Sequence, residues 1–232
     1  MSKIIGPSVS LNGLVLWLDA ANPKSYTSGS TTWYDMSGNN NHGTLVSGSG
    51  YSSANMGSIT FDGVNDYVNI GVDKSCNRFT ADFTISAWVY RSGSSGTWGN
   101  IMGDYYTGGT ANALEWQIAI DNTARLFVYN GTGGFLMNNI VSGFSVNSWI
   151  NVVLSRIGST LRLYANTNLI ASITNTTTFG SATGNFNIGI DGNNKAEPLT
   201  GYISNVLIYK NKGLTSDEVL QNYTALKSRY GL

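Results

Sequence analysis

The sequence predicts an all-β fold, a two-sheet antiparallel jelly-roll sandwich with one α-helix at its C-terminal end. Short segments of alternating apolar and polar residues recur along the chain, and a period of two marks half-buried strands. Gly, Asn and Ser separate these segments, and 28 Gly against 3 Pro suit tight turns between strands. Helical spacing of apolar residues is clear only near the end of the chain.

Length and charge limit what such a domain does. The chain has 232 residues, of which 41% are hydrophobic, enough for one large sandwich with a sizeable core. Only 11% are charged, and 13 basic residues balance 13 acidic ones. Nucleic-acid binding needs a concentrated basic footprint, so nucleic acid is rejected as a partner. No apolar run approaches the roughly 18 residues of a membrane-spanning helix, so no membrane insertion is expected.

The chain divides into an N-terminal arm, residues 1–12, and a single domain, residues 13–232, because no break in composition interrupts the latter. The single cysteine, Cys76, excludes an internal disulfide and a cysteine metal cluster. Met1–Pro7 lacks the apolar core of a signal peptide, so we expect synthesis in a reducing cytoplasm without export. This arm would be free to dock on a neighbouring subunit.

The first predicted strand is Leu14–Asp19, with Leu14, Leu16 and Leu18 on one face. The segment Trp33–Leu45 follows and contains three Asn and two Gly. Such a composition predicts a cluster of turns without regular secondary structure.

The segment Ser58–Ile70 is predicted to be the organising corner of the sandwich. Both of its halves alternate with the period of a strand, and Asp-Gly-Val-Asn-Asp between them tolerates tight or left-handed backbone. Asp62 and Asp66 therefore lie close together at one strand–turn–strand junction. They either form the mouth of a metal site or stabilise a sharp turn by accepting hydrogen bonds from backbone N–H groups.

The clearest strand is Phe83–Tyr90, in which Trp88 and Tyr90 share one face with polar residues while the opposite face is apolar. Nine further strands are predicted after it. They are Asn100–Gly103, Leu114–Ile120, Arg125–Tyr129, Phe135–Asn138, Trp149–Arg156, Thr160–Ala165, Leu169–Thr174, Asn185–Ile190 and Gly201–Tyr209. Many short strands joined by turns are typical of a sandwich or jelly roll.

A single helix is predicted, over about residues 215–230. Thr215 with Glu218 forms a capping box, and Leu214 with Val219 forms a hydrophobic staple. One face of the helix is apolar and is expected to pack on the rim of the sandwich. The residues on this face are Val219, Tyr223, Leu226 and Tyr230.

In order, these segments resemble the successive motifs of the laminin G-like, concanavalin A-like jelly-roll family. The motifs are Leu14–Asp19, Trp33–Gly43, Phe61–Val68, Phe83–Val89, Trp149–Arg156, Leu161–Tyr164, Gly201–Tyr209, Gly213–Val219 and Asn222–Leu226. The resemblance spans nearly the whole chain and implies a concanavalin A-like sandwich. It leaves function open, because lectins, glycosidases, adhesion modules and structural domains share this fold.

A narrower resemblance concerns context. The first strand, the Asn-rich loop and the C-terminal helix are similar to those of laminin G-like structural proteins of tailed phages of aquatic bacteria. Modules of this family usually act outside cells, whereas this chain has no recognisable export signal. A virion protein would resolve that conflict, since it assembles in the host cytoplasm and leaves by lysis.

The residues argue against an enzyme. Glycosidases of this fold use two carboxylates that flank the scissile bond, commonly as Glu-x-Asp-x-Glu along one strand. Glu115 has no acidic residue at the alternate positions, and Glu218 caps the helix, so no local pair exists. His42, the only histidine, lies in a polar turn beside Gly43, which suits neither a Ser-His-Asp triad nor a zinc site. We expect no catalytic residues, unless the fold itself brings carboxylates together.

Calcium is the one candidate cofactor. Asp62, Asp66 and the Gly63 carbonyl offer oxygen ligands, which calcium prefers. The family resemblance implies two further carboxylates on the C-terminal strand, in the pattern Gly-x-Ile-Asp-Glu-Val. Ser204 and Asn205 occupy these positions here, and they keep an oxygen but lose the charge. A turn capped by the two aspartates is therefore favoured over a calcium site.

Sugar-binding sites combine aromatic faces with hydrogen-bonding amides in loops. The aromatic candidates are Trp98, Tyr105 and Tyr106, and the amide candidates are Asn193 and Asn194. A role in closing the core is favoured for each single aromatic residue, because aromatic side chains dominate such cores. Tyr105 and Tyr106 lie in a Gly-rich loop and are the best exposed candidates.

The function expected from the sequence is that of a non-enzymatic virion surface structural protein of a tailed phage, acting as head decoration, fibre or tail adhesin. It would display a lectin-like jelly roll for particle assembly and attachment to host glycan. Low charge suits packing against other virion proteins or copies of itself. The alternative is a free carbohydrate-binding lectin module of a cell, and a glycan hydrolase ranks third.

Overall fold

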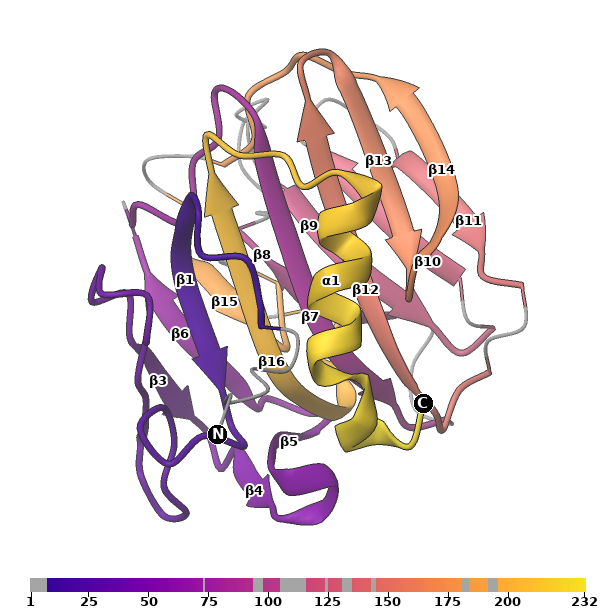
Figure 1. Ribbon diagram of the computed structural model, residues 1–232. Coiled ribbons are helices and arrows are strands. Elements are labelled where there is room, and N and C mark those ends of the chain that lie inside the picture. Colours follow the sequence, from indigo (N-terminus) through magenta and orange to yellow (C-terminus); the bar gives the residue numbers. More distant parts are fainter. Residues whose placement is uncertain are drawn as a thin grey trace, which may run out of the picture.

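The computed structural model describes residues 8–72, 74–93, 98–104, 116–123, 125–130, 135–142, 145–180, 184–191 and 196–232. Two antiparallel sheets pack face to face, and one helix lies against the outer surface of the nearer sheet (Figure 1). The predicted fold class is confirmed. The division into an arm, residues 1–12, and a domain, residues 13–232, stays a prediction.

Sheet A is the sheet that carries the helix. Its strand order is β14-β13-β12-β7-β16-β5-β4, and β1 also pairs with β16. The strands are β1 (Leu14–Asp19), β4 (Gly50–Ser52), β5 (Ser58–Asp62), β7 (Phe83–Arg91), β12 (Trp149–Ile157), β13 (Thr160–Ala165), β14 (Asn168–Thr174) and β16 (Thr200–Lys210).

Sheet B is the opposite sheet, with the order β11-β10-β9-β8-β15-β6-β3-β2. Its strands are β2 (Thr32–Trp33), β3 (Gly43–Val46), β6 (Tyr67–Gly71), β8 (Trp98–Gly103), β9 (Trp116–Asp121), β10 (Arg125–Asn130), β11 (Phe135–Ile140) and β15 (Phe186–Ile188). The helical elements are η1 (Ala54–Met56), α1 (Ser216–Leu226) and η2 (Lys227–Tyr230).

The core lies between the two sheets and follows the strand period. In β7, Ile85 and Val89 point into this core, whereas Trp88 belongs to a second apolar cluster on the outer face of sheet A. In β1, a register shift between Leu14 and Leu16 places Leu14 in that outer cluster. The expectation that Leu14 shares a face with Leu16 is therefore wrong, because a bulge adds a residue and reverses the alternation.

The prediction of an irregular segment at Trp33–Leu45 is wrong at both of its ends. β2 ends at Trp33, and β3 begins at Gly43 and pairs with β6, where Thr44 lies opposite Asn69. The backbone N–H and C=O groups of these short strands form hydrogen bonds with neighbouring strands. Because those partners are distant in the sequence, local composition does not predict the pairing. The short strand β4 was also absent from the sequence prediction.

The corner predicted at Ser58–Ile70 consists of β5, a turn and β6. Because β5 belongs to sheet A and β6 to sheet B, the chain crosses from one sheet to the other at this turn. Gly63 adopts a φ of 81°, a left-handed conformation that favours glycine. The strand–turn–strand prediction is confirmed, and the turn links the two layers of the sandwich.

The C-terminal helix begins as predicted. The Thr215 N–H donates to Glu218 Oε2 (2.9 Å), and Thr215 Oγ1 accepts from the Glu218 N–H (3.4 Å), which completes the capping box. Leu214 and Val219, the predicted staple, are both buried in the outer apolar cluster. Within the described residues, no helix is long and apolar enough to cross a membrane.

The predicted position of the helix on the rim is wrong. α1 runs across the outer face of sheet A, in front of β7, β12 and β16 (Figure 1). Trp88, Val153 and Leu207 form an apolar surface on these three strands, and Val219 and Leu226 of the helix cover it. Burying that surface stabilises this position, because apolar area removed from water contributes about 25 cal/mol per Å².

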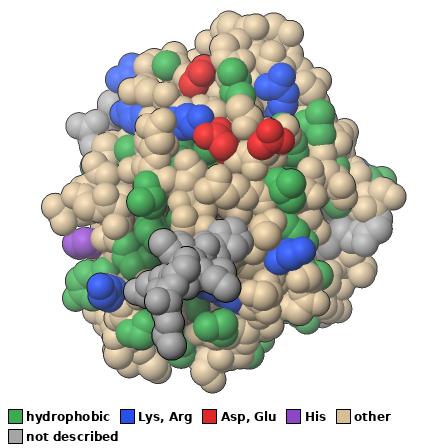
Figure 2. All heavy atoms as spheres, viewed as in Figure 1, with side chains coloured by type: hydrophobic (Ala, Val, Ile, Leu, Met, Phe, Trp, Pro, Cys, Tyr) green, Lys and Arg blue, Asp and Glu red, His purple; other side chains and the backbone are tan. Residues whose placement is uncertain are grey.

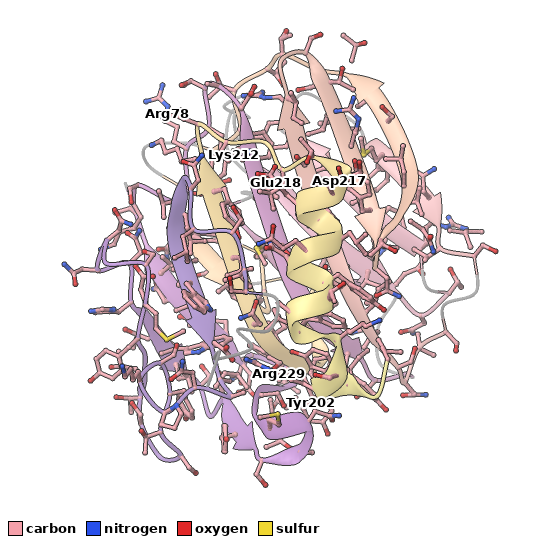
Figure 3. The ribbon with its side chains drawn as sticks, viewed as in Figure 1. Arg78, Tyr202, Lys212, Asp217, Glu218 and Arg229 are labelled. Atoms are coloured by element: carbon pink, nitrogen blue, oxygen red, sulfur yellow. The ribbon has the colours of Figure 1, made fainter. Side chains whose placement is uncertain are left out.

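Charged side chains are unevenly distributed over this face. Lys212, Asp217 and Glu218 lie at the start of α1 (Figure 3), and Figure 2 shows acidic and basic side chains gathered there. Lys212 Nζ and Glu218 Oε1 form an ion pair at 2.6 Å. Toward the other end of the helix the visible surface is mainly uncharged.

Candidate ligand-binding site

Three aromatic residues form a row across the outer face of sheet A. Trp149 of β12 lies opposite Tyr90 of β7, and Tyr90 lies opposite Tyr202 of β16. The rings meet edge to face, with centroids 5.7 Å apart for Tyr90 and Trp149 and 5.4 Å apart for Tyr90 and Tyr202. Direct cross-strand neighbours pack in this way, so the pairing register itself creates the row.

The helical segment covers only one end of this row. In the adjacent row, Trp88 is 1% exposed because Tyr223 of α1 and Tyr230 of η2 stack on its ring, at 5.4 and 4.1 Å. The chain then turns at Gly231, where φ is 73°. Tyr230 also packs against Trp149, with ring centroids 4.7 Å apart, so the cover ends at this residue. Trp149, Tyr90 and Tyr202 stay partly exposed.

A cleft borders this row, and we call it the aromatic cleft. It comprises a cavity of about 800 Å³ and a smaller one of about 200 Å³. Asn55, Tyr90 and Trp149 line both of them. The larger cavity is also lined by Val141, Ser142, Ser145, Asn147, Ser148, Ala165, Asn166, Asn168, Tyr230 and Leu232, and the smaller one by Ser52, Ala54, Ser58 and Tyr202.

Hydrogen bonds fix the Trp149 ring in place. Its Nε1–H donates to Asn55 Oδ1 (3.1 Å), and Asn55 Nδ2 donates to the Arg229 carbonyl (3.2 Å). The Arg229 guanidinium in turn pairs with the buried Asp19 carboxylate at 2.7 Å. This chain of contacts ties the wall of the cleft to η2 and to β1, so the aromatic surface is formed before any ligand arrives.

Two amides project donors into the larger cavity. Asn147 Oδ1 accepts from the Gly93 N–H (2.9 Å), and Asn166 Oδ1 accepts from the Asn151 N–H (3.0 Å). Both asparagines have positive φ, 65° for Asn147 and 56° for Asn166. With both oxygens occupied, the NH₂ groups remain as the donors of these side chains.

The lining carries no charged side chain within the part of the chain that the structure describes. Hydroxyl, amide and aromatic groups supply its polarity instead. Burial raises the pKa of the Tyr230 phenol, so this group stays neutral at physiological pH. The cleft therefore suits an uncharged ligand that offers apolar faces together with hydrogen-bond acceptors.

Trp98, the one predicted ligand-binding residue that the structure describes, lies on sheet B. Its ring stacks on Phe135 (centroids 5.4 Å apart) and packs against the buried Phe127 (3.9 Å). Trp98 is therefore on the opposite sheet from the aromatic cleft. The other predicted ligand-binding residues, Tyr105, Tyr106, Asn193 and Asn194, lie outside the described residues, as does Glu115.

Buried amides lie beside Trp98 on the outer face of sheet B. Gln117 Nε2 donates to Glu197 Oε2 (3.0 Å), and the Asn100 N–H donates to the Glu197 carbonyl (2.8 Å). Asn100 and Gln117 are both buried, so the segment that carries Glu197 covers them. These contacts give Glu197 an amide partner.

Asp62 and Asp66 lie together and cap the turn. Asp66 Oδ2 accepts from the Asp62 N–H (3.0 Å), and Asp62 Oδ1 accepts from the Val64 N–H (2.8 Å). Burial and the Asp62 charge raise the pKa of Asp66, against the lowering effect of its bond to the Asp62 N–H. The turn-stabilising interpretation accounts for two of these four carboxylate oxygens, one on each aspartate.

Ser204 and Asn205 are not brought to this turn. Asp62 pairs with Thr200, and Ser204 Oγ donates to the Gly57 carbonyl (2.6 Å) beyond the other end of β5. Four strand residues span about 13 Å, well beyond a shared coordination shell. Asn205 is buried opposite Trp88, so the five proposed calcium ligands do not form one cluster.

The described residues also lack a metal cluster and a histidine centre outside this turn. Among the described residues, no three His, Cys, Asp or Glu side chains gather in an arrangement that would hold a metal ion. His42 Nδ1 accepts from the Asp35 N–H (3.0 Å), so it stabilises its own loop. Cys76 is buried, and burial raises the pKa of its thiol to about 12.

Comparison with known families agrees with this architecture. A family model described as the concanavalin A-like lectin/glucanases superfamily (Laminin_G_3) matches residues 62–220. The chain belongs to this superfamily. The laminin G-like, concanavalin A-like resemblance is thereby confirmed, whereas no curated protein matches the sequence.

Several solved structures share the fold of this superfamily member. Trypanosoma rangeli sialidase matches with a TM-score of 0.66 and 16% identity, over 94% of this chain and 33% of the sialidase chain. The binding domain of Paraclostridial Mosquitocidal Protein 1 matches with a TM-score of 0.69 and 16% identity, over 91% of this chain and 52% of that one. The chain thus spans about a third to a half of these proteins.

One matched structure is nearly the same length as this chain. Domain 4 of AbnA, a GH43 extracellular arabinanase from Geobacillus stearothermophilus solved in complex with arabinotriose, has a TM-score of 0.66. The identity is 15%, over 90% of this superfamily member and 98% of that domain. At such identities the likeness shows the fold.

Sequence reasoning missed the residues of the aromatic cleft as ligand-binding candidates. Tyr90, Trp149 and Tyr202 each lie in or beside a correctly predicted strand, and Tyr90 was placed on the face that is not apolar. Their meeting depends on β7 lying between β12 and β16. The signal available in the sequence was an aromatic residue near the end of each of three strands.

Proposed function

We propose that this protein is a non-hydrolytic carbohydrate-binding module and that the aromatic cleft on sheet A holds the glycan. The observation that carries the proposal is the open row Trp149–Tyr90–Tyr202, bordered by amide donors and by no charged side chain of a described residue. The C–H faces of sugar rings pack on aromatic faces, while their oxygens accept hydrogen bonds. Concave sites with apolar walls and a few placed polar groups are typical of small-molecule recognition.

The comparisons support a carbohydrate ligand. The AbnA domain that matches nearly end to end was solved in complex with arabinotriose. We carry only the ligand class to this chain. Its site is argued from its own residues, because the identities are 15–16%.

The absence of hydrolysis is part of the proposal. Inverting and retaining glycosidases both require two carboxyl groups, about 5–10 Å apart, on either side of the scissile bond. The described lining of the cleft offers neither Asp nor Glu. On the opposite sheet, Glu197 is engaged by Gln117.

A glycan array followed by titration calorimetry tests binding. We expect Trp149→Ala to weaken binding of the best array glycan at least tenfold, because the variant removes an indole ring that lines both cavities of the cleft. Trp98→Ala is the matched control, since it removes a half-buried indole from sheet B and should leave affinity within twofold. Binding lost in Trp98→Ala but kept in Trp149→Ala would move the site to sheet B, and an array without hits would end the proposal.

Hydrolysis is checked separately. The protein should release no reducing sugar from the polysaccharides of its array hits. Activity that Glu115→Gln abolishes would overturn the non-enzymatic assignment.

The setting of this module is proposed from the sequence resemblance. A virion surface protein of a tailed phage would use the cleft for attachment to host glycan, and low charge would favour its assembly with other subunits. A free lectin module of a cell is the alternative, and the carbohydrate-binding likeness supports that alternative more directly. Mass spectrometry of purified particles decides between them, because a virion protein must be present there.

A further inference from the structure

The two cavities of the aromatic cleft meet at one aromatic wall. Trp149 and Tyr90 line both, while Tyr202 borders only the smaller cavity and Asn166 only the larger one. Figure 3 shows Tyr202 near Arg229, at the end of the helical segment. The cleft therefore extends to both sides of the Trp149–Tyr90 pair.

The cavities differ in size and in chemistry. Sites for small molecules commonly enclose about 300–1,000 Å³, so the smaller cavity, at about 200 Å³, has room for roughly one ring. Its walls are aromatic rings with the hydroxyls of Ser52 and Ser58. The larger cavity, at about 800 Å³, offers the oriented NH₂ donors of Asn147 and Asn166.

We infer that the cleft binds a neutral oligosaccharide across the Trp149–Tyr90 wall, with one sugar ring against Tyr202 and the next units beside Asn147 and Asn166. This inference rests on the proposed function and specifies its ligand. A single sugar fills only one cavity. A chain of two or more units contacts both and binds more tightly, since the second contact adds no further cost of association.

Charge selectivity follows from the same lining. A carboxylate or sulfate on the sugar would meet amide and hydroxyl donors but no cationic side chain of a described lining residue. The nearby guanidinium of Arg229 is already paired with Asp19. Removing a charge from water without an opposite charge is costly, so anionic glycans should bind more weakly than neutral ones.

Titration calorimetry with arabino- and cello-oligosaccharides of one to four units tests chain length, and trigalacturonate tests charge. We expect at least a tenfold gain in affinity from the monosaccharide to the disaccharide in the better series. Trigalacturonate should bind at least tenfold more weakly than the neutral trisaccharide. Binding should be insensitive to salt.

Two pairs of variants separate the cavities. Tyr202→Ala should reduce the gain in affinity from the monosaccharide to the disaccharide to less than threefold. Tyr202→Phe keeps the aromatic ring and should preserve the wild-type gain. Asn166→Asp keeps the oxygen that accepts from Asn151 N–H but removes the NH₂ donor, so it should weaken every chain length. Asn40→Asp, which adds the same charge at an exposed asparagine of similar φ (58°) that lines neither cavity, is its control.

A monosaccharide that binds as tightly as the trisaccharide, or trigalacturonate that matches the neutral sugars, would overturn the inference and leave the proposed function standing. The inference would also fail, with the proposed function still standing, if Tyr202→Ala kept the full gain in affinity from one to two sugar units. If a folded protein bound none of these oligosaccharides and no array glycan, the proposed function itself would fail.

Discussion

The outer face of sheet A is covered by a helix, whereas the described cover of sheet B includes an irregular segment that carries Glu197. On sheet A, apolar residues such as Trp88 and Leu207 are buried beneath α1 and η2. On sheet B, the covered residues include the amides of Asn100 and Gln117. The same strand architecture thus supports an apolar second core on one side and a buried polar layer on the other.

The difference explains where an open site forms. A helix satisfies its own backbone hydrogen bonds and ends at a definite residue, here before Gly231. The aromatic row beyond that end is covered by the helical segment only at Trp149, on which Tyr230 packs. Buried amides on sheet B instead require partners, and residues of the covering segment supply them.

The substitution with the largest expected effect on stability is Trp88→Ala. Trp88 is 1% exposed and stacks on Tyr223 and Tyr230, so its loss should destabilise the fold by about 3–5 kcal/mol. Urea unfolding measures the change. Trp98→Ala removes a half-buried indole of the same size from sheet B and should cost clearly less. Equal losses would show that the helix-covered face is not a second core.

Arg229→Ala should have the next largest effect, about 2–3 kcal/mol. It leaves the buried Asp19 carboxylate without its cation, a change that costs about 3–5 kcal/mol for a fully buried pair. The Arg229 side chain is 20% exposed, which reduces the figure. Lys212→Ala breaks the more exposed pair with Glu218 and should cost about 0.2–1 kcal/mol in the same urea titration. Comparable values for the two variants would contradict this ranking.

Glu218→Gln should have a smaller, pH-dependent effect. Burial alone would raise the pKa of Glu218, but Lys212 and the Thr215 N–H lower it below its ordinary value. The carboxylate therefore stabilises the fold above the unfolded pKa of about 4.3, and this contribution is lost as pH falls through the lower folded pKa. Because the group is partly exposed and screened, the loss at pH 7 should be about 0.5 kcal/mol.

Urea unfolding of wild type and Glu218→Gln between pH 2 and 7, roughly the range that spans both pKa values, checks this prediction. The difference in stability should shrink toward the acid end. Asp217→Asn, one residue away and outside the capping box, is the control. A difference that grew as pH fell would refute the capping role.

Calcium should have the smallest effect, namely none. Asp62 and Asp66 are occupied by backbone N–H groups, and Ser204 lies beyond the far end of β5. The melting midpoint should not move in millimolar calcium or after addition of chelator. If calcium raised the melting midpoint of the wild-type protein but not that of Asp66→Asn, the interpretation of the corner as a metal site would be restored.

Local patterns predicted much of the fold. Thr160–Ala165 and Leu14–Asp19 coincide with β13 and β1, and the capping box of Thr215 and Glu218 formed as expected. Alternation and capping act within a few residues, so they are readable without tertiary context. The short strand β2 escaped prediction because its pairing with β3 is decided by the rest of the sheet.

The candidate site was the least predictable part. Trp98 was selected for its loop position, and the structure places it in a packed aromatic group on sheet B. The local sequence around Trp149 and Tyr202 predicts only that both residues lie in strands. Nothing in their local sequence shows that β7 lies between β12 and β16, the strands that carry these two residues.

The sequence by itself determined most of the longer strands, where the helix begins, and that Asp62 and Asp66 share a turn, because these features depend on near neighbours. Only the tertiary structure decided that Trp149, Tyr90 and Tyr202 form a row and that the helical cover ends beside it. The pairing register of distant strands follows from burying the whole core, and a change of one residue would turn each ring to the opposite face.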